Sequence, residues 1–168
     1  MICIAALAGA GISTPGFAQH VTPASTPFEA NGIASIDNGT PYTCNLKLIG
    51  DTNAASGSHP NHTDGGTFIG TNTGSFPCPL ITVNDVSDKA TFTVTGPGTA
   101  DIYNLKVYVN NNLTCKHDGP VPFTFTNTNP GMDITLDPTL LYDMTQNPPT
   151  LTCEVAADLH TDDIEGAL

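Results

Sequence analysis

Two histidines and one aspartate lie close together in the segment SGSHPNHTDGG, at positions 59, 62 and 64. The imidazoles of His59 and His62 and the carboxylate of Asp64 are ligand types that zinc and copper accept, and a short loop can bring them together. The segment is also rich in glycine and proline, which is typical of a polar loop, and a metal must offset the entropy lost when such a loop becomes ordered. We therefore expect solvated histidines and no bound cofactor, with a metal site at these three residues as the alternative.

Two acidic clusters offer oxygen ligands of the kind that calcium binds. One lies at residues 84–88 (NDVSD), and the other runs from Asp158 to Glu165. Neither matches the spacing of a known calcium loop, and Asn and Asp are also common turn residues. We expect a turn at 84–88 and a solvated acidic C-terminal tail over residues 158–168, with calcium binding as the alternative.

No arrangement of side chains in the sequence is typical of catalysis. No serine lies in a Gly-x-Ser-x-Gly nucleophile elbow, and Ser58 stands beside His59 only in sequence. Asp133 and Glu154 alternate with apolar residues and are therefore expected on a polar face, where burial does not raise the pKa of a carboxyl group. Tryptophan, the usual platform for stacking sugars, is absent. We expect a protein that is not an enzyme.

The charge balance argues against nucleic acids and anionic membranes as partners. Four lysines and no arginine stand against sixteen acidic residues, which gives a formal net charge of -12. Both kinds of partner are bound mainly through Lys and Arg, so this surface repels them. The sequence also lacks an apolar stretch long enough to span a bilayer, and we expect no transmembrane segment in the mature chain.

The N-terminal residues 1–18 are typical of an export signal. Ile2 to Ile12 form an apolar core, and the small residues Gly16 and Ala18 follow the turn-forming segment 13–16. We expect cleavage after Ala18, although the usual basic residue near the start is absent, and a buried N-terminal strand or helix is the alternative. Export predicts a secreted or cell-surface protein with one domain over residues 19–157.

Four cysteines remain once the signal is removed, which predicts two disulfides and allows three connectivities. Cys44 and Cys153 lie in segments of strand-like character, whereas Cys78 lies between two prolines in a loop. The spacing favours Cys44–Cys78 and Cys115–Cys153, each closing a loop of nearly forty residues. Cysteine-bound zinc is disfavoured because the chain has no CxxC knuckle.

The elements that must position these residues are short strands. Apolar residues occupy every second position in several segments, a period that places one face in a core and the other in water. These segments are residues 42–48, 90–95, 103–109, 123–125, 132–136 and 151–155. No segment keeps a helical period, although residues 140–142 are compatible with one helical turn. The pattern predicts an all-β protein, an antiparallel β-sandwich that is immunoglobulin-like in its general architecture.

One of these segments predicts an outer face with apolar members. If residues 101–109 form a single strand, Tyr103 and Leu105 face the core, and Ile102 and Tyr108 lie with Lys106 on the polar side. Together with many outward threonines, such a face suits adsorption at an oil–water boundary, although threonine is also simply common in strands.

The order of several short phrases resembles one family. The segment 21–32 (VTPASTPFEANG) precedes a Thr-Cys strand at Cys44, a Gly- and Thr-rich stretch, a Cys-Pro pair at Cys78 and two Leu-Thr-Cys phrases that end at Cys115 and Cys153. This order is similar to that of the secreted alkane oxidation activator proteins of Gram-negative bacteria, over about residues 21–155.

The resemblance implies a non-enzymatic exported protein that promotes alkane use at the cell surface or at an oil–water boundary. Its expected partners are an alkane or oil surface, or other cell-surface proteins. The alternative is a structural or adhesive surface subunit, such as a pilus or biofilm-matrix component, that is joined by strand exchange at a sheet edge.

Overall fold

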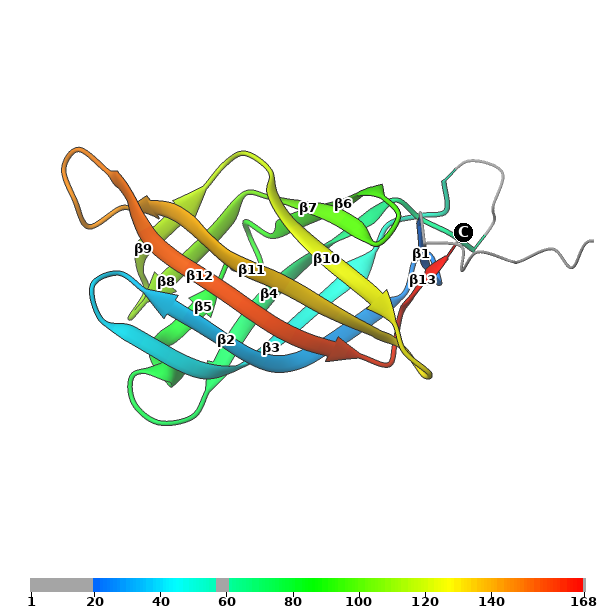
Figure 1. Ribbon diagram of the computed structural model, residues 1–168, viewed down its shortest axis with the longest axis horizontal. Coiled ribbons are helices and arrows are strands. Elements are labelled where there is room, and N and C mark those ends of the chain that lie inside the picture. The colour runs from blue at the N-terminus through cyan, green and yellow to red at the C-terminus, as the bar shows by residue number, and fades with distance from the viewer. Residues whose placement is uncertain (1–19, 57–60, 168) are drawn as a thin grey trace, which may run out of the picture.

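A computed structural model describes residues 20–56 and 61–167, so the expected export signal and His59 lie outside the described residues. The chain forms strands throughout (Figure 1). In chain order the elements are β1 (His20–Thr22), β2 (Pro27–Asp37), β3 (Pro41–Thr52), β4 (Gly65–Thr73), the 3₁₀ turn η1 (Cys78–Leu80), β5 (Ile81–Val83), β6 (Ala90–Gly96), β7 (Thr99–Tyr103), β8 (Leu105–Val109), β9 (Asn112–His117), β10 (Val121–Asn127), β11 (Met132–Asp143), β12 (Thr150–Thr161) and β13 (Glu165–Ala167).

The sheet closes into a barrel, which corrects the expected sandwich. Eight strands follow one another around it in the order β10-β7-β6-β4-β3-β2-β12-β11, and β10 pairs with β11 to complete the ring. Strands β5, β8 and β9 link β4 to β11 in the same way at the other end of the barrel. A sandwich and a barrel require the same alternation of inward and outward residues, so the sequence pattern could not separate them.

The alternating residues fill the barrel with apolar side chains. On β3, for example, Cys44, Leu46 and Leu48 are buried, while Asn45 between them is exposed. Two glycines on neighbouring strands let aromatic rings pack flat against the backbone: a Cβ at Gly50 would lie 2.6 Å from the ring of Phe28, and one at Gly66 would lie 2.6 Å from the ring of Phe92. Each buried phenylalanine contributes about 1.5–3 kcal/mol to the free energy of folding.

Both disulfides have the pairing expected from the sequence. Cys44 on β3 is bonded to Cys78 in η1, with 5.5 Å between the Cα atoms. Cys115 on β9 is bonded to Cys153 on β12, with 6.0 Å between the Cα atoms. The bonds therefore tie two peripheral segments to long strands of the barrel.

The segment 101–109 is two strands and not one. Asn104 separates β7 from β8 with a positive φ of 56°, a conformation that asparagine tolerates better than most residues. This residue resets the alternation, so Ile102 is buried in the core together with Leu105. The expected exposure of Ile102 is wrong for this reason.

The C-terminal residues and the segment 140–142 also differ from the expectation. Residues 140–142 lie within β11, where a β-bulge after Leu136 accommodates Pro138. Residues 158–161 belong to β12, and β13 pairs with β1 through His20 and Ala167. The segment expected to be a solvated tail is thus part of the sheet, anchored by the buried Ile164.

Within residues 20–56 and 61–167, no helix has the length and apolar character needed to cross a membrane.

Candidate functional site

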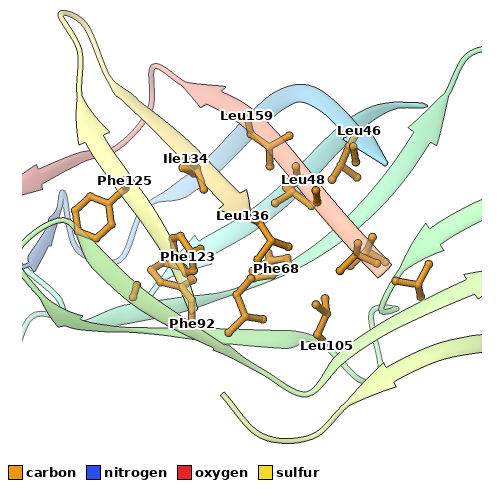
Figure 2. Close-up of a pocket in the computed structure, with 18 of the residues that line it drawn as sticks. Leu46, Leu48, Phe68, Phe92, Leu105, Phe123, Phe125, Ile134, Leu136 and Leu159 are labelled. Atoms are coloured by element: carbon orange, nitrogen blue, oxygen red, sulfur yellow. The ribbon is translucent and has the colours of Figure 1, made fainter. Parts of the chain in front are cut away.

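A cavity of about 110 Å³ lies inside the barrel. Figure 2 shows side chains from strands on all sides of the barrel pointing into it, among them Leu46, Leu48, Phe92, Phe123, Ile134 and Leu136. The surface that faces the cavity is almost entirely apolar. It is therefore a candidate site for an apolar ligand.

Small residues in one row of the barrel wall explain why the interior is not filled. Ala34 on β2 lies directly opposite Ala157 on β12, and in the same register Leu136 on β11 follows on one side and Cys44 on β3 on the other. Both alanines line the cavity and are only partly buried although they face inward. Two methyl groups side by side leave space that larger residues would occupy.

Aromatic rings form part of the cavity wall. The ring of Phe92 meets that of Phe28 edge-on, with 6.1 Å between centroids and an interplanar angle of 84°, and it meets that of Phe123 at 6.4 Å and 73°. Such edge-to-face contacts add about 0.5–1.5 kcal/mol per pair and fix the ring orientations. These contacts hold the rings in this part of the wall in place.

Asn72 on β4 is the amide side chain in the cavity lining, and it is only 7% exposed. Its Nδ2 donates a hydrogen bond to the Ile81 carbonyl, at 3.1 Å. Because a carbonyl can only accept, this bond fixes the orientation of the amide. Its Oδ1 is buried and has no hydrogen-bond partner among the described residues.

The expected histidine loop is only partly within the described residues, and it lies against a histidine of β1 that the sequence did not indicate. Nδ1 of His20 on β1 lies 2.5 Å from Asp64 Oδ1, and the rings of His20 and His62 stack with 6.0 Å between centroids. An isolated antiparallel bridge between Val21 and Thr63 brings these segments together. No group of three or more His, Cys, Asp or Glu side chains in residues 20–56 and 61–167 is arranged to hold a metal ion.

The 84–88 cluster forms a turn whose polar groups bond to one another. Asn84 Nδ2 donates to the carbonyls of Asp88 and Asn104, both at 2.8 Å, and its Oδ1 accepts from the Lys106 backbone N–H. The Lys106 ammonium group pairs with the Asp88 carboxylate and lowers its pKa. Asp85 Oδ1 accepts the hydroxyl and the backbone N–H of Ser87, and these bonds lower the pKa of Asp85. The oxygens that a calcium ion would need thus serve the turn itself.

The second acidic cluster surrounds a histidine. His160 on β12 lies with Nδ1 2.7 Å from Asp133 Oδ1 and with Nε2 3.0 Å from Asp162 Oδ1. These hydrogen bonds, first to Asp133 and then to Asp162, raise the pKa of His160. The arrangement is an exposed ion-pair network, in which a protonated imidazole relieves the repulsion between two carboxylates.

Three large apolar side chains lie next to one another on the outer wall. Tyr142 on β11 is directly opposite Leu151 on β12, and Leu140 precedes Tyr142 by two residues on the same face. Their exposed fractions are 45% for Leu140, 47% for Tyr142 and 46% for Leu151, and we call them the outer apolar cluster. The ring of His117 on β9 stacks against Tyr142, with 6.2 Å between centroids. Sequence reasoning missed this cluster because it misplaced residues 140–142.

Every lysine of the chain is paired with a carboxylate. Lys47 Nζ lies 2.6 Å from Glu29, Lys89 Nζ 3.4 Å from Asp51 and Lys116 Nζ 3.0 Å from Asp118, and Lys106 pairs with Asp88. The surface therefore offers no patch of unpaired positive charge within the described residues.

Comparison with known proteins identifies the family. Residues 1–163 match the family model described as alkane oxidation protein activator PraA/PraB-like. No curated protein matches the chain, and no solved structure does. Since the match extends over nearly all of the 168 residues, the resemblance read from the phrases around the cysteines is confirmed. The chain belongs to the PraA/PraB-like family of alkane oxidation protein activators.

Proposed function

We propose that this protein is exported and promotes the use of alkanes without catalysis, by contacting the hydrocarbon at the cell surface or at an oil–water boundary. The outer apolar cluster is the observation that carries the proposal. Large apolar side chains that are neighbours on one face and about half exposed mark interaction surfaces, whereas scattered ones are ordinary. Family membership supplies the class of hydrocarbon.

The composition of the surface supports contact with oil over contact with a charged partner. The lysines are paired with carboxylates, and the remaining charge is strongly negative. A net negative charge keeps individual molecules apart in water and so favours a dispersed protein that meets oil one molecule at a time.

The closed sheet bears on the alternative of a surface subunit joined by strand exchange. Each of the eleven strands in the large sheet is paired on both sides, because β10 also pairs with β11 and β4 with β5. Strand addition requires a free edge. Among the described residues, only β1 and β13, three residues each, are unpaired along one whole side. The segment 136–141 of β11 is also unpaired on one side, but the bulge and Pro138 interrupt it. This pairing favours contact through side chains over polymerisation through the backbone.

Interfacial tension at a hexadecane–water boundary tests the proposal. The wild-type protein should lower the tension, and the triple variant Leu140→Ser, Tyr142→Ser and Leu151→Ser should do so more slowly and to a smaller extent. A double variant of scattered exposed side chains, Ile33→Ser and Ile49→Ser, is the matched control and should retain most of the effect. A wild-type protein without surface activity, or equal loss in both variants, would refute the role of the cluster.

A further inference from the structure

The cavity inside the barrel is a second apolar feature, separate from the outer apolar cluster. We propose that it binds one end of an unbranched saturated hydrocarbon chain, and that among ligands short enough to enter whole it selects the hydrocarbon over the alcohol with the same number of carbons. This inference goes beyond the proposed function, because contact with an oil surface needs only the outer wall.

The size of the cavity limits what it can hold. An engineered cavity of about 150 Å³ lined by Leu, Ile and Phe stays dry and binds benzene, so the volume of about 110 Å³ here suits a ligand somewhat smaller than benzene. A water molecule takes up about 30 Å³ in the liquid, and a methylene group is of similar size, so the space fits on the order of four carbons. A longer chain would have to leave its remaining carbons outside.

The chemistry of the wall favours a chain without polar groups. A hydroxyl group that enters the cavity gives up its hydrogen bonds to water and must find a partner inside. The lining contains two polar residues, Ser35 and Asn72. The Nδ2 of Asn72 is committed to the Ile81 carbonyl and its Oδ1 is buried in the wall. Ser35 alternates with the inward-facing Ala34 and Ile36 on β2 and is exposed, so its hydroxyl lies on the outer side of the wall. A hydrocarbon loses nothing on entering, so the site discriminates through the cost of removing the hydroxyl from water.

The strand pairing places a weak point of the wall beside the cavity. β11 pairs with β10 through residues 132–135 and with β9 only at residues 142–143. Between these ladders, in the part of the chain that the structure describes, residues 136–141 pair with β12 alone and include the bulge after Leu136. Leu136 itself lines the cavity. Local opening along this seam gives a chain access without breaking a strand-to-strand ladder.

Methyl-resolved NMR of the full chain tests the inference with dissolved ligands and no oil phase. Propane, n-butane and n-pentane should each cause saturable shifts of the methyl signals of Leu46, Leu48 and Leu136. Affinity should rise about fourfold with each carbon up to roughly the size of the cavity and then level off. The dissociation constant of 1-propanol, which is short enough to enter whole, should be at least tenfold higher than that of propane.

Variants locate the ligand. Ala157→Leu fills the space and should abolish the shifts, whereas Asn45→Leu, which adds the same side chain to the outer face of β3, should leave binding unchanged. If Ala157→Leu does not fold, the smaller change Ala34→Val should weaken binding and serves instead. Asn72→Leu alters the wall itself and should change the affinities for propane and 1-propanol by the same factor, because we assign no hydrogen bond between its Oδ1 and the ligand.

Three results would overturn the inference. The first is the absence of saturable shifts with every hydrocarbon, and the second is full binding in a folded filled variant. The third is 1-propanol binding as tightly as propane, with a loss of affinity in Asn72→Leu for 1-propanol alone, which would show that Oδ1 accepts the hydroxyl. Because no oil phase is present, none of these results bears on the outer apolar cluster.

Discussion

Removing one disulfide by a double alanine substitution should destabilise the protein by an amount that the loop lengths predict. The bonded cysteines are separated by 34 residues in Cys44–Cys78 and by 38 residues in Cys115–Cys153. In the chain-entropy model, loops of these lengths correspond to about 3.8 and about 3.9 kcal/mol at 25 °C. All four sulfurs belong to residues that are at most 5% exposed, so replacement by alanine leaves a similar small void in both cases. We therefore expect nearly equal losses of about 4 kcal/mol.

Urea unfolding followed by far-ultraviolet circular dichroism measures these losses. The dependence of the unfolding free energy on urea should steepen slightly in each variant, because the unfolded chain is less compact without the bond, so midpoint and slope must both be fitted. A typical domain is stable by 5–15 kcal/mol, and each variant should therefore still fold at 25 °C. A loss below about 1 kcal/mol for either pair would refute the argument from loop closure. Losses that differ by several kcal/mol would show that native contacts, and not loop length, determine the effect.

Three further predictions test other features. Asn104→Ala should destabilise the protein by about 2–3 kcal/mol in urea unfolding, because it places alanine in a left-handed conformation and removes the hydrogen bonds of the asparagine side chain. Asn104→Gly removes the same hydrogen bonds without the backbone strain and should cost less. Equal losses in the two variants would exclude the backbone contribution. Phe92→Ala should cost about 3–5 kcal/mol, and a loss below about 1 kcal/mol would show that the neighbouring rings collapse into the space. His160 should titrate above the ordinary pKa of 6.5, because of its bonds to Asp133 and Asp162. Since the pKa of His160 is higher in the folded state, the contribution of this residue to stability should be fully present below pH 6.5 and lost as the pH rises through the folded pKa. NMR titration of the His160 ring protons should show the raised pKa in the wild type. Asp133→Asn should reduce the shift.

The sequence predicted the local structure where the alternation was regular. Residues 42–48, 90–95 and 132–136 all lie within strands, because a period of two has few other structural solutions. The spacing and local character of the cysteines favoured the disulfide pairing that the structure has. What a regular period cannot encode is which strand lies beside which. The pairing of β10 with both β7 and β11 closes the sheet, and no local pattern distinguishes it from an open pair of layers.

Two interruptions of the alternation and one buried anchor account for the local errors. Asn104 changes the phase of the alternation within a segment that reads as continuous, so every inward and outward assignment before it is reversed. The bulge near Pro138 has the same effect on β11. The acidic C-terminal residues read as a tail because their charges dominate, whereas Ile164 anchors them by burial.

The candidate sites depended on long-range register and were therefore not predictable. The cavity exists because Ala34 meets Ala157, and an alanine in either strand alone carries no such information. His20 approaches Asp64 only because β1 runs beside the loop that contains Thr63. Of the three residues in the metal-ligand hypothesis, His62 and Asp64 are described and lie near His20, which the sequence pattern did not indicate.

The pairing of β1 with β13 determines how the molecule would respond to mechanical force. His20 and Ala167 are direct partners at one end of the barrel, so pulling on these two residues loads the hydrogen bonds one after another, as in a zipper (Figure 1). The next pair to open, β2 and β12, is loaded in the same way from His160 and Asn31. The disulfides limit the extension, since the force passes through the bonds and bypasses the segments 44–78 and 115–153, so that only residues 20–44, 78–115 and 153–167 can lengthen. A molecule held at its two ends would therefore yield at low force and lengthen by a limited amount, and it would keep a covalently closed remnant of its wall.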